Sequence, residues 1–375
     1  MIKKSIILII ASLLLSSCQT VNYEKYSLLT VNDEKFIPPT KSKYIRGVSK
    51  EQWTIINKIG DPLNCEERIN KLNKIQKGNI ITSQEYSNDH FVIHTSLREN
   101  KVTILTEGTY NLINPIVVPE NKYLIGEGDV IINANFAEMG IYNSGNIKNL
   151  TIQNAKTYGV FLGNFSTTYN VLVTGTGINH PLNSNGNGVH SNGTASHSNC
   201  VVSVETSFGY NEQGSSNITI KGGNADGFTV KYGAHDITFI DTHAHHNSDD
   251  GYDFWKGGAE KPTTTYQPTI RIFYSSANHN GKNPFTPNGD GNGFKFGSWD
   301  QYQRNRGRDK GDRLIYGSVA CYNLEKGFDR NRSRMKIITQ NLNSTGNIVN
   351  YKDVPVPFNK NNLDKSALTC EMFPK

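Results

Sequence analysis

Short polar turns alternate with brief apolar segments along most of this 375-residue chain. An Asn-rich turn is followed by a glycine and then by a few alternating residues, as in Gly227-Phe-Thr-Val-Lys-Tyr-Gly233 and Gly251-Tyr-Asp-Phe-Trp255. Between these turns lie β-branched segments such as Asp236-Ile-Thr-Phe-Ile240. Segments of this kind, bounded by Asn and Gly, are typical of β-strands. The pattern therefore predicts an all-β chain.

The turn-and-strand pattern repeats with units of roughly 20 to 40 residues, which is the signature of a solenoid of stacked coils. The units are too uneven in length for the blades of a propeller. We therefore predict a parallel β-helix.

The segment from 49 to 76 has a different pattern. Ile69, Leu72 and Ile75 recur at helical spacing after Asn64-Cys-Glu-Glu67. Because a β-helix needs its open apolar end covered, we predict that this segment is an N-terminal cap. With one solenoid signal, we expect a single domain from 44 to 375, in which about 44 to 100 form the cap.

If the repeated glycines are equivalent points on successive coils, the residues beside them form ladders with a spacing of about 4.8 Å. The position before the glycine gives the ladder Asn187, Asp226, Asp250, Asn292 and Lys326. The position two residues after it gives the ladder His190, Thr229, Asp253, Lys295 and Asp329. Stacked carboxylates repel one another unless some are protonated or a cation binds, and a site of hard oxygen ligands favours calcium.

The acidic residues also have an ordinary interpretation, because Asp and Asn commonly shape the corners of a β-helix. On that interpretation Asp226, Asp249 and Asp250 are turn residues. Asp253, however, falls within a predicted strand, and a lysine follows it on the same ladder. A lone lysine on a strand is normally solvated, so the prediction of a chemical role for Lys295 depends on the acids.

Four runs together resemble the pectate lyases of polysaccharide lyase family 9: Asn224-Ala-Asp-Gly227, Asn247-Ser-Asp-Asp-Gly-Tyr-Asp253, Gly289-Asp-Gly-Asn-Gly-Phe-Lys-Phe-Gly297 and Gly327-Phe-Asp-Arg-Asn331. The resemblance covers residues 100 to 345. It implies a right-handed parallel β-helix and Lys295 as the Brønsted base. It also implies a catalytic calcium ion with the ligands Asp226, Asp249, Asp250 and Asp253.

The reaction that this resemblance implies is β-elimination on a uronic acid polymer. The proton at C5 becomes acidic only when the neighbouring carboxylate is neutralised, which calcium achieves. A neutral lysine then removes the proton, and departure of the C4 oxygen leaves an unsaturated sugar. Because nearby carboxylates raise the pKa of a lysine, we expect activity to be highest at alkaline pH.

Two features depart from the family pattern. The stretch from 299 to 313 is long and basic, and Arg330 stands where related sequences commonly carry an uncharged polar residue. Arginines suit carboxylate recognition, and we predict that Arg330 binds substrate. These departures leave substrates other than plain polygalacturonate open.

Two other functions are consistent with the sequence. A β-helix glycoside hydrolase would use the Asp cluster as acid and base, without calcium and with Lys295 idle. A noncatalytic surface protein would use a structural calcium and bind polysaccharide. The histidines His243, His245 and His246 lack the spacing of a zinc site, and we interpret them as surface and turn residues.

The first residues predict export. Lys3 and Lys4 precede an apolar run and then Leu15-Ser-Ser-Cys18, which is typical of a bacterial lipoprotein signal. We predict a signal peptide over 1–17, a lipid anchor on Cys18, and a tether over 18–43. The expected location is the outer membrane or cell surface, and the alternative is a secreted or periplasmic protein with an ordinary signal.

Four further cysteines, Cys65, Cys200, Cys321 and Cys370, allow three disulfide pairings in an oxidising compartment, and Cys200 and Cys321 could instead be buried thiols. The formal net charge of +6 suits an acidic polysaccharide but is too small a surplus to indicate nucleic-acid binding. We expect a monomer.

Overall fold

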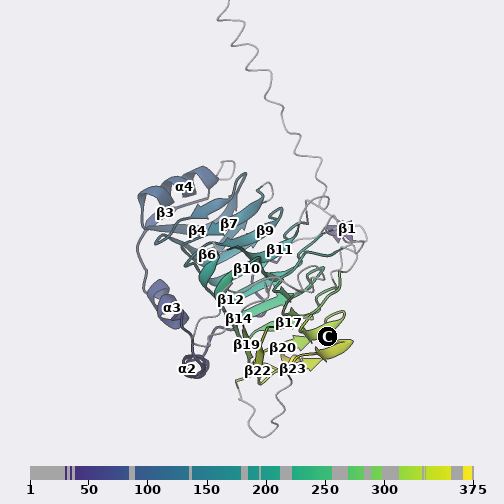
Figure 1. The fold of residues 1–375 in the computed structure, drawn as a ribbon. Coiled ribbons are helices and arrows are strands. Elements are labelled where there is room, and N and C mark those ends of the chain that lie inside the picture. The colour runs from purple at the N-terminus through teal and green to yellow at the C-terminus, as the bar shows by residue number, and fades with distance from the viewer. Residues whose placement is uncertain are drawn as a thin grey trace, which may run out of the picture.

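The computed structural model is a right-handed parallel β-helix, which confirms the predicted fold class (Figure 1). It describes residues 39–83, 89–134, 137–178, 185–193, 196–211, 222–255, 269–282, 289–297, 312–331, 333, 335–355 and 366–373, and the backbone of 30–31 and 34–35. Within these residues, the helices are too short or too polar to cross a membrane.

The strands form a 13-stranded and a 9-stranded parallel sheet. The larger sheet contains β3 (Asn79–Ile81), β4 (Val102–Asn111), β6 (Tyr123–Asn133), β8 (Asn146–Gln153), β10 (Thr167–Thr174), β12 (His197–Ser207), β14 (His235–His245), β16 (Ile270–Phe273), β17 (Ser276–Asn278), β19 (Arg313–Tyr316), β20 (Val319–Cys321), β22 (Ile337–Gln340) and β23 (Asn343–Thr345). The smaller sheet contains β5 (Ile116–Val118), β7 (Met139–Asn143), β9 (Tyr158–Leu162), β11 (Asn187–Asn192), β13 (Phe228–Lys231), β15 (Tyr252–Asp253), β18 (Phe294–Lys295), β21 (Lys326–Asp329) and β24 (Val349–Lys352).

The remaining elements lie outside these two sheets. They are the helices α2 (Lys50–Ile59), α3 (Cys65–Asn73) and α4 (Asp89–Glu99), the antiparallel pair β1 (Thr30–Val31) and β2 (Glu34–Lys35), and the short 3-10 helix η3 (Cys370–Met372).

Buried asparagines explain the Asn-rich turns of the sequence. Asn247 donates a side-chain hydrogen bond to Asn280 at 2.9 Å, Asn280 donates to Asn323 at 3.0 Å, and Asn323 donates to Asn347 at 3.0 Å. The same amides also bond to backbone groups of neighbouring coils, as when Asn280 donates to the carbonyl of Ala244. Polar groups buried at a corner need such partners, so this ladder fixes where each coil turns.

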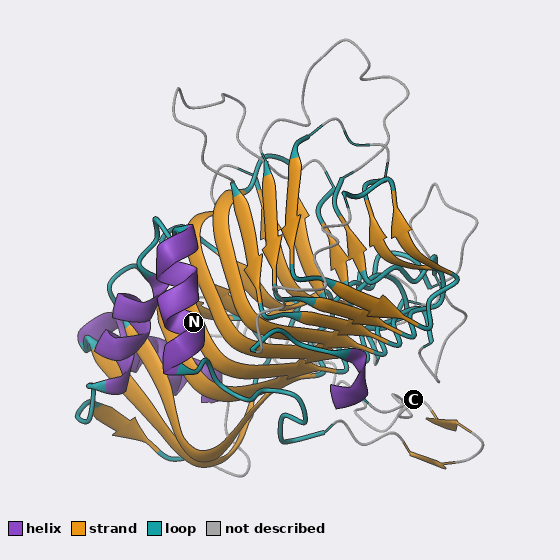
Figure 2. Cartoon of the chain, turned by 90° about the horizontal axis from the view of Figure 1, so that it is seen from below, coloured by secondary structure: helices purple, strands orange, loops and turns teal. Residues whose placement is uncertain are grey.

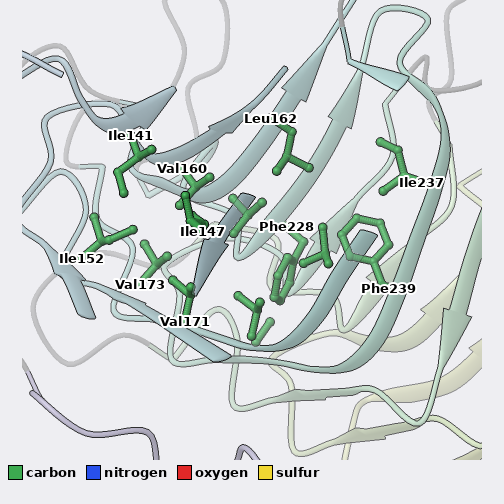
Figure 3. Close-up of a cluster of buried hydrophobic side chains, with 14 of the residues drawn as sticks. Ile141, Ile147, Ile152, Val160, Leu162, Val171, Val173, Phe228, Ile237 and Phe239 are labelled. Carbon is green, nitrogen blue, oxygen red and sulfur yellow. The ribbon is translucent and has the colours of Figure 1, made fainter. Parts of the chain in front are cut away.

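The interior is filled by aliphatic side chains in the first coils and by aromatic rings in the later ones. Figure 3 shows residues such as Ile141, Val160 and Phe228 directed into the same interior. Phe228, Tyr252, Phe294 and Phe328 stack with ring-centroid separations of 4.8, 4.4 and 4.9 Å. This stack forms a buried layer of aromatic rings on the inner face of the later strands of the smaller sheet.

The helix α4 closes the N-terminal end of the coil. Its buried Ile93 and Leu97 join the main hydrophobic core, which they share with Leu105 and Ile116. In Figure 2 the helices, drawn in purple, lie along one side of the stacked strands, and Figure 1 places α4 at the N-terminal end with α3 and α2 further along the solenoid. The helix α4 therefore covers the apolar end of the solenoid that was expected to need a cap.

The segment from 49 to 76 forms helices as predicted, but it does not cover that end. Ile56, Ile69 and Leu72 pack instead against the outer face of the larger sheet, on residues that include Ile125 and Val202. A disulfide joins Cys65 of α3 to Cys200 of β12, and a second one joins Cys321 of β20 to Cys370 of η3. Amphipathic spacing identifies an apolar helix face, but it does not tell which surface of the solenoid that face meets.

Because both cysteines form disulfides, Cys200 and Cys321 are not free thiols.

The chain just before α2 lies across the outside of the larger sheet. The buried carboxylate of Glu205 accepts hydrogen bonds from Ser42 Oγ at 2.6 Å and from the backbone nitrogens of Lys43 and Tyr44 at 2.9 and 2.8 Å. His245 Nε2 lies 3.0 Å from the same carboxylate. The predicted tether thus ends slightly earlier than residue 43, because Ser42 is already bound to the solenoid.

Of the histidines predicted as surface and turn residues, His243 and His245 are buried, whereas His246 is partly exposed in the turn that follows β14. His243 bonds to Asp241 at 2.8 Å and to Ser276 at 2.9 Å, and the ring of Tyr44 packs edge-on against His245. The segment from Ser42 to Tyr44 that covers them was not predicted from the sequence. These histidines therefore hold the N-terminal segment in place.

The contacts of Glu205 predict a pH-dependent stability. Burial would raise its pKa, but the bonds from His245, Ser42 and Tyr44 outweigh burial and lower the pKa to about 2 from an ordinary 4.5. A lowered carboxyl pKa contributes stability that is present above the unfolded pKa and is lost as the pH falls. We expect the gap in unfolding free energy between wild type and Glu205→Gln, on the order of a few kcal/mol at neutral pH, to shrink from pH 4.5 towards 2. Denaturant unfolding across this range measures it, and a constant gap would contradict the assignment.

Candidate active site

Strand register confirms both predicted ladders. Successive strands of the smaller sheet pair His190 with Thr229, Thr229 with Asp253, Asp253 with Lys295, and Lys295 with Asp329. Backbone bonds one coil apart align the other ladder, because Gly227 N donates to the carbonyl of Asp250 and Gly251 N donates to that of Asn292. The acids and the lysine thus meet on the outer face of this sheet.

Three of the four predicted calcium ligands converge. Asp226, Asp249 and Asp250 each present a carboxylate oxygen, and these oxygens all lie within 4.8 Å of one another. All three residues are buried. Asp249 accepts backbone bonds from Asn224 at 2.6 Å and from Asp290 at 3.0 Å, which fix its orientation. Within the described part of the chain, Asp226 Oδ2 makes no hydrogen bond, and it lies 3.5 Å from the ammonium of Lys231.

Asp253 lies beside this trio but is paired with Lys231. One Asp253 oxygen accepts a hydrogen bond from the Lys231 ammonium, and the other is buried and finds no hydrogen-bond partner among the residues that the structure describes. Lys231 did not emerge as a functional candidate from the sequence. The signal was present, since Lys231 lies two residues after Thr229 on the same face of β13.

Lys295 lies at the other side of the trio. Its ammonium donates to Asp250 Oδ2 at 2.9 Å and to Asp290 Oδ2 at 3.2 Å, and 17% of its side chain is exposed. Asp290 was also missed, although it falls in the glycine-rich run directly before Lys295. The five carboxylates of this site therefore face two lysines.

Burial governs the ionisation of these groups. It raises the pKa of Asp226 to about 6, against the opposing field of Lys231. Burial and neighbouring carboxylates raise the pKa values of Asp249 and Asp250 well above the usual range. Burial would lower the pKa of Lys295, but Asp250 and Asp290 outweigh it and raise that pKa. The trio is thus poorly compensated by protein charges alone.

A cleft of about 530 Å³ opens over this site. Its walls include Lys231, Asp249, Asp253, Asp290 and Lys295, and also Asn187, His190, Tyr158, Tyr232 and Trp255. Charged and aromatic side chains therefore share one hollow on the outer face of the smaller sheet.

The predicted arginine does not line this cleft. Arg330 Nε donates instead to the backbone carbonyl of Asp353 at 2.8 Å. Arg313 is buried, and its Nη1 donates to Thr269 at 3.2 Å. The other arginines of the basic region, Arg304, Arg306, Arg308, Arg332 and Arg334, and the predicted lipid anchor at Cys18 lie outside the described residues.

The donor set fits a hard divalent cation. All of its ligand atoms are carboxylate oxygens, which calcium prefers, and the trio is preorganised by backbone hydrogen bonds. Asp226 Oδ2 and Asp253 Oδ1 have no hydrogen-bond partner among the described residues. Such buried carboxylates gain from a bound cation, because Lys231 and Lys295 offset only part of the charge of the five carboxylates.

The fold and this cleft define a right-handed β-helix protein with an acid–lysine site on one sheet. The chain belongs to the family described as "Pel9A-like, right handed beta helix region", which matches residues 72–362. None of the curated proteins matches the chain.

Solved structures with a similar fold are distant. The catalytic unit of a GH87 alpha-1,3-glucanase from Streptomyces thermodiastaticus is 12% identical, with a TM-score of 0.35 over 79% of this chain and 68% of that one. The A-module of the mannuronan C-5 epimerase AlgE4 from Azotobacter vinelandii is 9% identical, with a TM-score of 0.33 over 76% of this chain and 99% of that one.

The pairing of Lys231 predicts a clear effect on stability. Lys231→Met leaves Asp253 and Asp226 buried without their cation, so we expect a loss of about 3–5 kcal/mol in unfolding free energy in the presence of a chelator. Denaturant unfolding measures the loss. The control is Lys326→Met, which breaks a more exposed pair with Asp329 and should cost less. Equal losses in the two variants would contradict the assignment.

Proposed function

We propose that the chain is a calcium-dependent polysaccharide lyase that cleaves a uronic acid-containing polysaccharide by β-elimination. The observation that carries the proposal is that Lys295 bonds to the Asp226, Asp249 and Asp250 trio at the floor of a cleft that Lys295 and Asp249 line. Membership of the Pel9A-like family and the resemblance to pectate lyases of polysaccharide lyase family 9 support it.

In this proposal the trio, joined by Asp253, holds the calcium ion. Calcium bound there would neutralise the substrate carboxylate and stabilise the negative charge that develops when the C5 proton leaves. The backbone bonds to Asp249 and Asp250 keep these ligands oriented before substrate arrives. Pre-oriented charge of this kind lowers the barrier without reorganisation during the reaction.

Lys295 is the proposed base. Its neutral amine takes the C5 proton, a C4–C5 double bond forms, and the C4–O bond breaks, so that the departing oxygen receives a proton from solvent. Asp290, 3.2 Å from the amine, stabilises the resulting ammonium. The partial exposure of Lys295 lets its amine reach a bound polymer.

The geometry weighs against the hydrolase alternative. A hydrolase that inverts configuration holds its two carboxyl groups about 6.5–9.5 Å apart to admit a water, and one that retains it holds them about 5–5.5 Å apart. One oxygen each of Asp226, Asp249 and Asp250 lies within 4.8 Å of the other two, which supports a shared cation rather than a water held between an acid and a base. A noncatalytic binding protein would differ from the lyase in forming no unsaturated product from the polysaccharide that it binds.

Export as a lipoprotein anchored at Cys18 is part of the proposal. The pairs Cys65–Cys200 and Cys321–Cys370 support passage through an oxidising compartment. The outer membrane or cell surface, an acidic polysaccharide as the partner and a monomeric state remain predictions of the sequence.

Calcium binding can be tested without activity. Adding calcium to chelator-treated protein should raise the Tm, since a ligand that binds only the folded state stabilises it. Asp250→Asn removes one charge at nearly constant shape and should abolish most of the shift. Asp129→Asn, at an exposed pair with Lys41, is the matched control and should keep the shift. A full shift in Asp250→Asn would count against this site.

Activity tests the base. Incubation with uronic acid polysaccharides and calcium should produce the ultraviolet absorbance of unsaturated uronates. Lys295→Ala should lower the rate by about 10²–10⁴-fold, the range for a lost general base, while it keeps the calcium-dependent Tm shift. Lys326→Ala is the control with normal activity. New reducing ends without absorbance would establish a hydrolase, and binding without any product would establish the noncatalytic alternative.

A further inference from the structure

The ladder that carries Asp253 and Lys295 becomes aromatic in the earlier coils. Register pairs His190 with Phe161 and Phe161 with Tyr142, so these rings lie in line with the acids and the lysine. Tyr142 comes from β7 and Phe161 from β9. One face of the smaller sheet is therefore aromatic at its N-terminal end and charged further along.

The rings of this strip support one another. Tyr142 stacks on Phe161 at 5.4 Å, and Tyr158 stacks on His190 at 4.1 Å. Tyr142, Tyr158 and Phe161 are half-buried, so part of each ring faces solvent. We call these three residues the aromatic strip. Large aromatic side chains that stay partly exposed in a row beside a cleft are typical of binding surfaces.

His190 joins the strip to the cleft. Only 4% of it is exposed, its Nδ1 bonds to Thr229, and no described residue bonds to its Nε2. Burial, and then the charge of Lys231, lowers its pKa to about 3, so the ring is neutral. The strip thus continues into the cleft wall without a positive charge.

The strip is unsuited to a carboxylate. Among the described residues that line the cleft, the cations are Lys231 and Lys295, and both lie on later coils, in β13 and β18. A uronate placed on the strip would lose water from its carboxylate without gaining a counter-ion, which is costly. The flat apolar face of an uncharged sugar has no such cost.

We propose that the aromatic strip binds an uncharged sugar of the substrate, and that the substrate is a heteropolysaccharide in which uronates are combined with uncharged sugars. Phe161 lies three strands before Asp253, which is about 14 Å at the strand spacing of a sheet. Each coil advances by nearly the length of one sugar, so the uncharged sugar lies a few residues from the bond that is cleaved. This inference rests on the proposed lyase function.

The experiment measures binding with Lys295→Ala, so that no polymer is cut. The probes are rhamnogalacturonan and hyaluronan, which alternate a uronate with an uncharged sugar, and polygalacturonate, which does not. Affinity electrophoresis with each polymer should show at least one heteropolymer bound about tenfold more tightly than polygalacturonate. Adding Tyr142→Ala and Phe161→Ala should remove about tenfold of that affinity, the order expected for two lost ring contacts.

Controls separate binding from folding. Phe165→Ala removes an exposed ring that packs edge-on against His197 away from the cleft, and it should leave every affinity unchanged. The Tm of the double variant should stay near that of its parent because both rings are half-buried. In a second variant, Phe161→Lys should shift the preference towards polygalacturonate by supplying a cation at that position of the ladder.

The outcomes distinguish this inference from the proposed function. Unchanged heteropolymer affinity in the double variant, preference for polygalacturonate, or no binding to any probe would overturn the inference. If the protein with Lys295 intact forms unsaturated product while the strip variants bind normally, the lyase function is supported and sugar binding by the aromatic strip is contradicted. If heteropolymer binding depends on the aromatic strip but the protein with Lys295 intact forms no product, sugar binding by the strip is supported and the lyase function is contradicted.

Discussion

The cleft depends on the backbone hydrogen bonds that hold successive coils in register at the repeated glycines. Gly227 N donates to the carbonyl of Asp250 at 3.0 Å, and Gly251 N donates to that of Asn292 at 2.8 Å. A Cβ on Gly251 would lie 2.7 Å from the carbonyl oxygen of Gly293, so a larger residue would push the coils apart. A slip of one residue would turn the acids of this face towards the core. The register of the coils therefore brings the carboxylates and lysines together on one face of the smaller sheet.

The wall behind the acids gives this concentration its electrostatic strength. The stacked rings of Phe228, Tyr252 and Phe294 fill the interior directly behind the strands that carry Asp253 and Lys295. Water is excluded from that side, so the carboxylates are solvated only through the cleft. Charges in such surroundings interact more strongly with one another and with a ligand than they would on an open surface. The same strands thus supply both the ligand groups and the low dielectric around them.

The sequence was sufficient for the fold and for the two ladders because glycines mark equivalent points on each coil and alternation then fixes which side chains face outwards. It was insufficient where the outcome depends on contacts between distant segments. The pairing of Lys231 with Asp253, the position of α3 against β12, and the choice among cysteine pairings are all of this kind. Arg330 departs from the family pattern and was predicted from the suitability of arginine for carboxylates, but its side chain bonds to Asp353 instead of lining the cleft. The local sequence pattern does not determine which distant group a long side chain contacts.

The N-terminal segment has a consequence for the order of folding. Ser42 and Tyr44 bond to Glu205, and Gly47 bonds to Asp241, across separations of 161 to 194 residues. Tyr44 also packs against Phe373 near the other end of the chain. Coils of the solenoid need only their neighbours, whereas this segment needs strands that are synthesised much later. The segment from Ser42 to Gly47 can therefore make these contacts only after β12 and β14 have formed.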